Sequence, residues 1–426
     1  MKRRDFLEFK LYQGEICDEI TMNERVAINS QCRYYKASKP CKFNKLDGSE
    51  CPTCRHVAPY RERILFIKLD AIGDVLRSGG LLPAIIARHE APYVAWLTRK
   101  DSVELVDMIT GVDEVIELSE LGIARIAADR WDFVYSLSND MPSATLASLA
   151  SAKAGRVVGY WLEGGMIRPS NGAAEIWLEM AAFDRLKKAN VESYQRRMLN
   201  ILDATNNAPQ PASLTIPPSL LAAAAARVQA AFPRRERQRV AVNVGAGGRW
   251  PKKMLDAQSL GSFIRILLAR RDVDVMLVGG AAEADKTEQV LALCNDARVR
   301  AFLTPRSIPE FVATLAQADV LFCGDTLALH ISSALGLPTV AVFGPTSEAE
   351  IADFDGLIRK LSASELECLC CYGDCNRVDH CMTQLDVDSL VSAILAQADC
   401  AMVQVRDGSA NSVPIWREGL LLNQYA

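Results

Sequence analysis

The feature that most constrains the fold is a repeated alternation of short apolar runs with longer helical patterns. The first run is residues 64–69, Ile-Leu-Phe-Ile-Lys-Leu, and a glycine turn and a helical pattern over 75–87 follow it. Helical stretches separate further strand-length runs at 94–97, 115–116, 133–135 and 157–158. Buried strands that alternate with helices predict an α/β architecture, with a parallel sheet covered on both faces.

The alternation occurs twice, on either side of a polar stretch with two prolines at residues 206–211. Such a composition is typical of a linker. Beyond it we predict a helix over 220–231 with Ser219 as its N-cap, and another that a capping box opens at Ser307. The strands of this second series are predicted at 240–244, 273–278, 320–323 and 339–343.

Two such series predict two facing Rossmann-like domains with ligands between them, at the carboxyl ends of the strands. We place the first domain at residues 59–208, the second at 209–400 and a C-terminal tail at 401–426. Residues 1–58 have no helical period and carry four cysteines between positions 32 and 54, so they are interpreted as a separate small module, β-rich or loop-rich, with little core of its own.

The bulk composition excludes some functions. The chain has 426 residues and a formal charge of −4, which argues against a dedicated nucleic-acid binder. Its apolar runs are too short to span a bilayer, and no apolar stretch follows the basic N-terminus. We therefore expect a cytoplasmic protein without a signal peptide or membrane anchor. Peripheral membrane association and the oligomeric state are left open.

Thirteen cysteines in a chain without a secretion signal indicate metal ligands or catalytic thiols more than disulfides. In the N-terminal module, one Cys-x-x-Cys pair and two further thiols match a tetrahedral site for structural zinc or iron. Free thiols or a redox role are the alternatives. The candidate ligands are Cys32, Cys41, Cys51 and Cys54.

A second cysteine cluster precedes the last predicted helix, which begins near Asp386. It holds five cysteines and His380, so several ligand sets are possible. The set that we predict for a second metal site is Cys368, Cys371, Cys375 and Cys381.

Three motifs place polar residues where strands end. In the first, residues 68–75, a strand leads into Gly73 and then Asp74 at the start of a helix. A carboxylate at that place in the cleft can act as a general base toward an acceptor hydroxyl. The alternative is that Asp74 only caps the helix.

The second motif is a glycine-rich loop between a strand and a helix that starts near Asp256. Glycines let backbone N–H groups approach a diphosphate, and neighbouring cations supply the counter-charge. A plain glycine-rich turn is the alternative. The candidate residues are Gly245, Gly247, Gly248, Arg249, Lys252 and Lys253.

The third motif is residues 323–330, followed by the run 337–346. Asp325 and Thr326 end a strand and open a helix at the same edge of the sheet. His330 would add a switchable donor near sugar or phosphate oxygens. The alternative for His330 is a structural role on an apolar helix.

Together and in this order, the three motifs resemble those of glycosyltransferase family 9, the heptosyltransferase family. The resemblance covers roughly residues 62–400. It implies a GT-B fold, in which two Rossmann-like domains face each other, and an inverting glycosyltransferase. It also implies a nucleotide-sugar donor, which we expect to be ADP-linked and to carry heptose or a related sugar. The acceptor would be a hydroxyl of a lipopolysaccharide sugar or another surface glycan, a protein side chain or a small metabolite.

The resemblance also implies roles for individual residues. Asp74 would be the base, and Lys252 or Lys253 would bind the donor diphosphate. Glu283 would reach the nucleotide or the sugar. Asp325, Thr326 and His330 would face the donor. The family usually has a small residue where Leu327 stands. The larger leucine side chain leaves less room for the donor sugar, so a sugar other than heptose stays open.

The implied reaction needs no divalent metal if lysine and helix N-termini neutralise the leaving diphosphate. Two other classes of function compete with it. One is a non-transferase enzyme of the same fold, such as a sugar-nucleotide epimerase. The other is a scaffold whose cysteine modules bind a partner. Asp74 on the acceptor side favours transfer.

Overall fold

The structure is a computed structural model that describes residues 27–151, 156–234, 236–245, 251–304, 307–363, 366–373 and 375–406. The chain divides into two compact units, Met1–Tyr60 and Arg61–Ala426. No helix among the described residues is long and apolar enough to cross a membrane.

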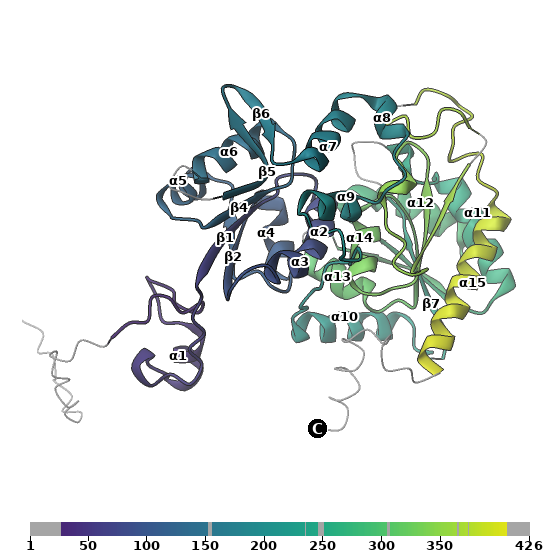
Figure 1. Ribbon diagram of the computed structural model, residues 1–426. Helices are drawn as coiled ribbons and strands as arrows, with labels where there is room; N and C mark the ends of the chain where they lie inside the picture. Colours follow the sequence, from purple (N-terminus) through teal and green to yellow (C-terminus); the bar gives the residue numbers. More distant parts are fainter. Residues whose placement is uncertain are drawn as a thin grey trace, which may run out of the picture. The chain divides into compact units, whose positions relative to one another are not determined.

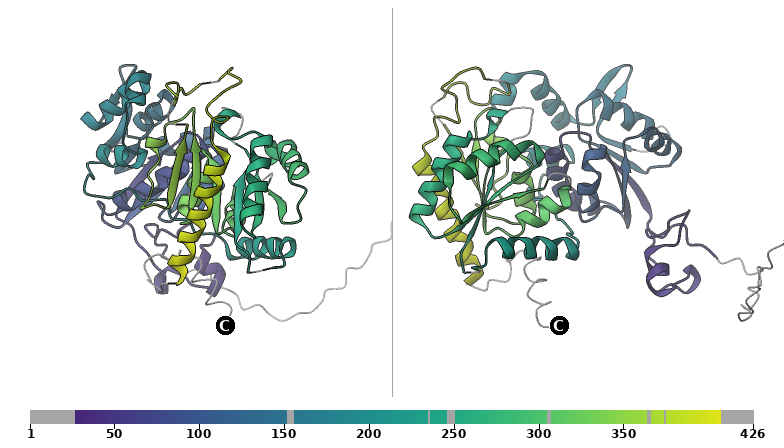
Figure 2. Two further views of the ribbon diagram at one scale, coloured as in Figure 1. Left: turned by 90° about the vertical axis from the view of Figure 1, so that its right-hand side faces the viewer. Right: turned by 180° about the vertical axis from the view of Figure 1, so that it is seen from behind.

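The larger unit contains two six-stranded sheets (Figures 1 and 2). In the first sheet the strand order is β3-β2-β1-β4-β5-β6, and all neighbours are parallel except β5 and β6. Its strands are β1 (Glu62–Ile67), β2 (Pro92–Thr98), β3 (Glu114–Glu117), β4 (Phe133–Ser136), β5 (Arg156–Glu163) and β6 (Met166–Pro169). This is the order of a doubly wound dinucleotide fold, with its topological switch point between β1 and β4.

The helices of the first domain connect these strands or follow the last of them. They are α2 (Ile72–Ser78), α3 (Leu82–Ile86), α4 (Val103–Asp107), α5 (Glu120–Ala128), α6 (Met141–Ser151), α7 (Gly172–Ala182), α8 (Asp184–Lys188) and α9 (Tyr194–Ile201). Short 3-10 turns are η2 (Gly79–Leu81) and η3 (Lys100–Ser102).

The second sheet repeats the same order, as β12-β11-β10-β7-β8-β9, and is parallel throughout. Its strands are β7 (Arg239–Asn243), β8 (Asp274–Gly279), β9 (Val299–Leu303), β10 (Val320–Gly324), β11 (Thr339–Phe343) and β12 (Ile358–Ser362). The α-helices are α10 (Pro218–Ala231), α11 (Ala257–Arg270), α12 (Ala284–Cys294), α13 (Ile308–Leu315), α14 (Leu327–Ala334) and α15 (Val387–Arg406). The 3-10 turns are η4 (Pro251–Lys253), η5 (Ala281–Glu283) and η6 (Glu348–Glu350). The switch point of this sheet lies between β7 and β10.

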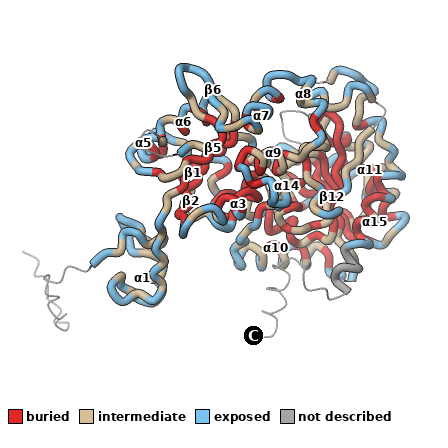
Figure 3. The backbone as a smooth tube through the Cα atoms, in the orientation of Figure 1, coloured by how far each residue is buried: buried red, intermediate tan, exposed pale blue. Residues whose placement is uncertain are grey.

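The buried strands explain why the apolar runs are continuous rather than alternating. In β7, Val240 and Val242 belong to one core cluster, while Ala241 between them belongs to the other. Successive side chains of a strand point to opposite faces, so a sheet with helices on both faces must be apolar at every position. Figure 3 shows this burial along the strands of both sheets.

The two domains of the larger unit meet through helices. Helix α2 of the first domain packs against α14 of the second, and α4 packs against α13. One core cluster therefore contains residues of both domains, among them Val75 and Leu329. This packing brings the loop after β1 next to the loop after β10.

The structure confirms and corrects details of the predicted helices. The Ser307 side chain accepts a hydrogen bond from the Glu310 N–H, which is one of the two bonds of the predicted capping box. Ser219 is not an N-cap, because the helix already begins at Pro218, with Pro217 in the cap position. Proline fits the first turn since its fixed φ suits the helix and its missing N–H is not needed there.

The described part of the smaller unit is loop-rich. It contains α1 (Lys42–Asp47) and η1 (Cys51–Thr53), neither of which has a buried residue. The rings of Phe43 and His56 stack with centroids 3.9 Å apart, and Tyr34 meets Phe43 edge-on at 4.9 Å. Such a unit has little apolar core to stabilise it.

Candidate functional site

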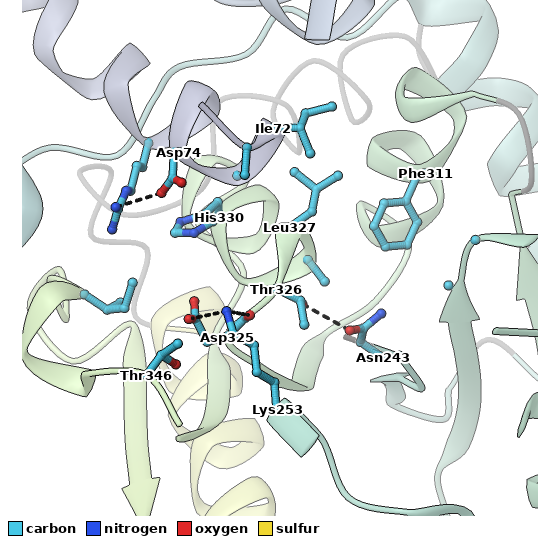
Figure 4. Close-up of a pocket in the computed structure, with 18 of the residues that line it drawn as sticks. Ile72, Asp74, Asn243, Lys253, Phe311, Asp325, Thr326, Leu327, His330 and Thr346 are labelled. Carbon is cyan, nitrogen blue, oxygen red and sulfur yellow. Dashed lines mark hydrogen bonds and ion pairs between the residues drawn. The ribbon is translucent and has the colours of Figure 1, made fainter. Parts of the chain in front are cut away.

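A cavity of about 750 Å³ lies where the two domains of the larger unit meet (Figure 4). Its walls come from the loops and helices that follow β1, β7, β8, β9, β10 and β11. The switch points of both sheets open onto it, which is where open α/β sheets bind ligands. The described residues of all three predicted motifs contribute to its lining.

Asp74 lies in the first turn of α2 and lines the cavity. Its carboxylate pairs with Arg77 one turn later, with Arg77 Nη2 2.7 Å from Asp74 Oδ1. The N-cap of α2 is Ala71, so the alternative that Asp74 caps the helix is wrong. Asp74 is instead a half-buried carboxylate that faces a cavity and can accept a proton.

The loop before Asp74 is fixed by a buried ion pair. Lys68 Nζ lies 2.9 Å from Asp70 Oδ2, and the Ser138 hydroxyl donates to the same carboxylate. Burial opposes ionisation of Asp70, but Lys68 and Ser138 outweigh it and lower its pKa to about 2. The Ser138 hydrogen bond connects the loop after β4 to the loop after β1, so together with the ion pair it stabilises the turn that presents Asp74.

His330 lies on α14 and contacts the same turn from the other domain. Its ring packs directly on Gly73, where a Cβ would come within 2.7 Å of His330 Cδ2. Burial lowers the pKa of His330 to about 4, and the Arg77 cation acts in the same direction. The imidazole is therefore neutral at pH 7 and can donate or accept one hydrogen bond beside Asp74.

Asp325 and Lys253 form an ion pair on the second-domain side of the cavity, with Lys253 Nζ 3.0 Å from Asp325 Oδ2 (Figure 4). Burial disfavours the Asp325 anion, but Lys253, through its charge and its hydrogen bond, together with His330 and Thr346 outweighs burial and lowers the pKa of the carboxyl. Both side chains are less than one-fifth exposed. The Lys253 ammonium and the Asp325 carboxylate are therefore weakly screened by solvent.

The glycine-rich loop is described only in part. Gly245 lines the cavity, whereas Gly247, Gly248 and Arg249 lie outside the described residues. The Glu283 side chain covers Gly245 so closely that any Cβ there would collide with it. Glu283 Oε2 accepts a hydrogen bond from the Gly280 N–H at 2.9 Å. Glycine at 245 therefore makes room for the carboxylate of Glu283 beside the cavity.

The two candidate lysines differ in their surroundings. Lys253 lines the cavity, while Lys252 is not among its lining residues. Lys252 Nζ donates to the backbone carbonyls of Cys375 and Arg377 instead. Of the two, Lys253 is the one placed to meet a ligand.

Thr326 is the N-cap residue of α14, and its hydroxyl donates to Asn243 Oδ1 at 3.1 Å. Asn243 was not singled out from the sequence, although it ends β7 two residues before Gly245. Arg77, Glu350, Lys187 and Tyr372 also line the cavity without having been predicted. Arg77 had a signal in the sequence, because it follows Asp74 at helical spacing.

One wall of the cavity is apolar. Leu327 projects from the start of α14 near Ile72 of α2, and Phe311 of α13 continues this wall (Figure 4). The charged groups Asp74, Lys253 and Asp325 lie to the other side of Leu327 in the same view. A ligand in this cavity therefore meets apolar and charged surfaces at different ends.

Four cysteines of the smaller unit, Cys32, Cys41, Cys51 and Cys54, line one cavity of about 310 Å³. Backbone N–H groups of Ala58 and His56 donate to the sulfurs of Cys32 and Cys54, both at 3.4 Å. Within the described residues, however, no group of three or more His, Cys, Asp or Glu side chains is arranged to bind a metal ion. The metal site with Cys32, Cys41, Cys51 and Cys54 stays a prediction.

The second cluster lies next to the loop after β11. The Cys381 sulfur packs against Gly344. Burial raises the pKa of Cys381, and the sulfurs of Cys368, Cys371 and Cys375 are near enough to raise it further. The second predicted metal site also stays a prediction.

Comparison with known proteins gives one consistent result. The sequence model of glycosyltransferase family 9 (heptosyltransferase) matches residues 123–381. A Haemophilus influenzae protein assigned as a glycosyltransferase is 25% identical over 310 residues, which cover 68% of this chain and 84% of that protein.

Two solved structures show the fold. E. coli ADP-heptose LPS heptosyltransferase II superposes with a TM-score of 0.59 at 18% identity, over 79% of this chain and 98% of that one. A family 9 glycosyltransferase from Veillonella parvula gives a TM-score of 0.63 at 13% identity, over 79% and 97%. These likenesses confirm the predicted GT-B fold of two facing α/β domains. Since the family match covers more than half of the chain, the protein belongs to glycosyltransferase family 9, the heptosyltransferase family, and is a glycosyltransferase.

Proposed function

We propose that the protein transfers a heptose or related sugar from an ADP-linked donor to a hydroxyl of an acceptor glycan. The observation that carries the proposal is that one cavity collects Asp74 from the first domain and the Lys253–Asp325 pair from the second. A proton acceptor and a diphosphate-binding cation are the two groups that such a transfer needs. The name of the similar E. coli enzyme, an ADP-heptose LPS heptosyltransferase, supports the choice of donor and of a lipopolysaccharide acceptor.

The donor would lie on the second domain. Lys253 would contact the diphosphate from the second-domain side of the cavity. The Glu283 carboxylate beside Gly245 would accept hydrogen bonds from a ribose or sugar hydroxyl. Asp325 and Thr326 would orient the donor sugar at the start of α14.

Transfer would proceed in a single displacement with inversion at the anomeric carbon. The acceptor oxygen bonds to that carbon, the bond from the carbon to the phosphate oxygen breaks, and ADP leaves with the electron pair. Asp74 takes the acceptor proton. Lys253 stabilises the charge that develops on the diphosphate. Neutral His330 would donate a hydrogen bond to the ligand between these two groups.

Leu327 bears on the identity of the donor sugar. Its side chain occupies cavity space beside Ile72, so a sugar with a long exocyclic chain has less room there. The donor screen should therefore contain ADP-glucose as well as ADP-heptose.

The test is a thermal-shift and donor-hydrolysis screen with ADP-heptose, ADP-glucose, UDP-glucose and GDP-mannose. We expect an ADP-sugar to bind and to release ADP slowly in water. Asp74→Asn should lower ADP release by about 100-fold or more, the usual contribution of a general base, and leave ADP affinity unchanged. Asp256→Asn is the control, because Asp256 also lies at the N-terminal end of a helix but does not line the cavity. Binding of none of these donors would overturn the proposal.

We also propose a structural metal in the smaller unit, bound by Cys32, Cys41, Cys51 and Cys54. Their fit rests on the shared cavity and on the backbone N–H donors that face two of the sulfurs. Zinc or iron would stabilise a unit that has little apolar core.

A further inference from the structure

Arg77 is a nearly buried cation that touches Asp74 in the first domain. Its side chain is only 12% exposed, and Nη2 lies 2.7 Å from Asp74 Oδ1. The guanidinium also stacks on the Tyr194 ring, with its central carbon 3.9 Å from the ring centroid. Because Oδ1 is engaged by Arg77, the other carboxylate oxygen of Asp74 is left to receive a proton.

The second carboxylate that faces Arg77 belongs to the other domain. Glu350 in η6 places Oε2 3.9 Å from Arg77 Nη1. The Tyr372 hydroxyl donates to Glu350 Oε1 at 2.9 Å, and the Lys187 ammonium of α8 lies 3.7 Å from the Tyr372 ring centroid. The first domain therefore interacts with Glu350 in two ways. Arg77 pairs with Glu350 directly, and Lys187 contacts the Tyr372 ring, whose hydroxyl binds Glu350.

This arrangement ties the orientation of Asp74 to the contact between the domains. Burial opposes the Arg77 charge, but Asp74 and Glu350 outweigh burial and raise the pKa of Arg77, so it stays protonated. A guanidinium has several donors in one rigid plane, so a partner at Nη1 constrains the direction of Nη2. If the domains separate, Arg77 loses Glu350, and only Asp74 and the Tyr194 ring then restrain its guanidinium.

We propose that Arg77 is the positioning residue of the base and that Glu350 makes this positioning conditional on the two domains being together. The inference rests on the proposed role of Asp74. It predicts that a donor bound to the second domain meets a correctly oriented Asp74 only when the two domains are in contact. Premature proton transfer in an open cavity would then be suppressed.

The test measures ADP release from ADP-heptose together with ADP affinity and thermal stability. Arg77→Met should lower kcat about 100-fold with ADP Kd within about threefold, since misplacement of a catalytic group by an ångström costs about that much. Arg77→Lys should recover part of the loss, and methylguanidine should partly rescue Arg77→Ala. Glu350→Gln should lower kcat about fivefold. The Arg77→Met/Glu350→Gln double variant should be no slower than Arg77→Met alone, because Glu350 acts through Arg77.

Arg63→Met is the matched control. Arg63 also pairs with a carboxylate, Asp129 at 3.1 Å, and lies over the Trp131 ring, but it does not line the cavity. Its loss should lower stability and leave kcat unchanged. Additive losses at Arg77 and Glu350, or losses that follow ADP affinity, would overturn the inference. If Asp74→Asn keeps full activity, the proposed function fails; if only Asp74→Asn is inactive and Arg77→Met is active, the inference alone fails.

Discussion

The two adjacent lysines of η4 allow a sharp test of the donor site, because the sequence alone does not distinguish them. Lys253 lines the cavity and pairs with Asp325 at 3.0 Å, whereas Lys252 donates to backbone carbonyls of Cys375 and Arg377. We expect Lys253→Met to weaken ADP binding strongly and Lys252→Met to leave it nearly unchanged. The two variants remove the same charge from neighbouring positions.

The size of the effect follows from the surroundings of Lys253. Two unit charges about 4 Å apart attract by about 4 kcal/mol at an effective dielectric of about 20. Lys253 already pairs with Asp325 in the free protein, and it must share its charge with that carboxylate when the diphosphate binds. About half of the attraction, about 2 kcal/mol, is then left for ADP, which corresponds to an increase in Kd of about 30-fold.

Stability should respond at the same position. Lys253→Met leaves Asp325 poorly solvated beside the cavity without its closest cation, so the free energy of unfolding should fall by about 1–3 kcal/mol. The additional change Asp325→Asn should recover much of that loss without restoring ADP affinity. Isothermal titration with ADP and thermal unfolding measure the two quantities. The reasoning is refuted if Lys252→Met weakens ADP binding as much as Lys253→Met, or if Lys253→Met changes Kd by less than about twofold.

Two further predictions concern His330 and the smaller unit. The pKa of His330 is about 4 in the folded protein and near 6.5 when unfolded, so above pH 6.5 both states are neutral and the shift has no effect on stability. As pH falls from about 6.5 to about 4, only the unfolded state binds the proton, which lowers the free energy of unfolding by at most about 3 kcal/mol. His330→Gln should therefore lose less stability than the wild type over this pH range in thermal unfolding. An equal loss in both proteins would contradict the lowered pKa of His330. If the smaller unit binds zinc or iron through Cys32, Cys41, Cys51 and Cys54, elemental analysis should find about one metal ion per chain fewer in Cys51→Ser than in the wild type. Cys294→Ser, a control outside both cysteine clusters, should keep the wild-type metal content.

Much of the site could be predicted because its residues lie where strands end. Asp74, Asp325 and Thr326 follow β1 and β10 within a few residues, and a strand followed by a polar turn can be recognised without any tertiary structure. Their meeting in one cavity follows from the parallel order of the sheets. The position of the ligand edge was therefore accessible from the pattern of apolar runs alone.

The groups that surround Asp74 could not be found in this way. Glu350 and Tyr372 reach the cavity from loops whose courses depend on packing between domains, and no local pattern marks them. The choice between Lys252 and Lys253 depends on the direction in which each side chain of a short turn points. A shift of the turn by one residue would exchange the lysine that faces the cavity. Strands β6, β9 and β12 were missed because partly exposed edge strands do not have continuous apolar runs.

The two sheets of the larger unit have the same strand order, yet the loops at their switch points carry different chemistry. After β1 the chain places Asp70 and Asp74, and after β7 it places Gly245, with Asn243 as the last residue of the strand. The fold thus determines where a ligand can lie, and the residues at equivalent positions determine what happens to it. Because the proposed proton acceptor and diphosphate-binding cation come from different domains, neither domain can catalyse transfer alone. An ion pair that forms only when the domains are in contact, such as Arg77–Glu350, would link donor binding to the orientation of Asp74.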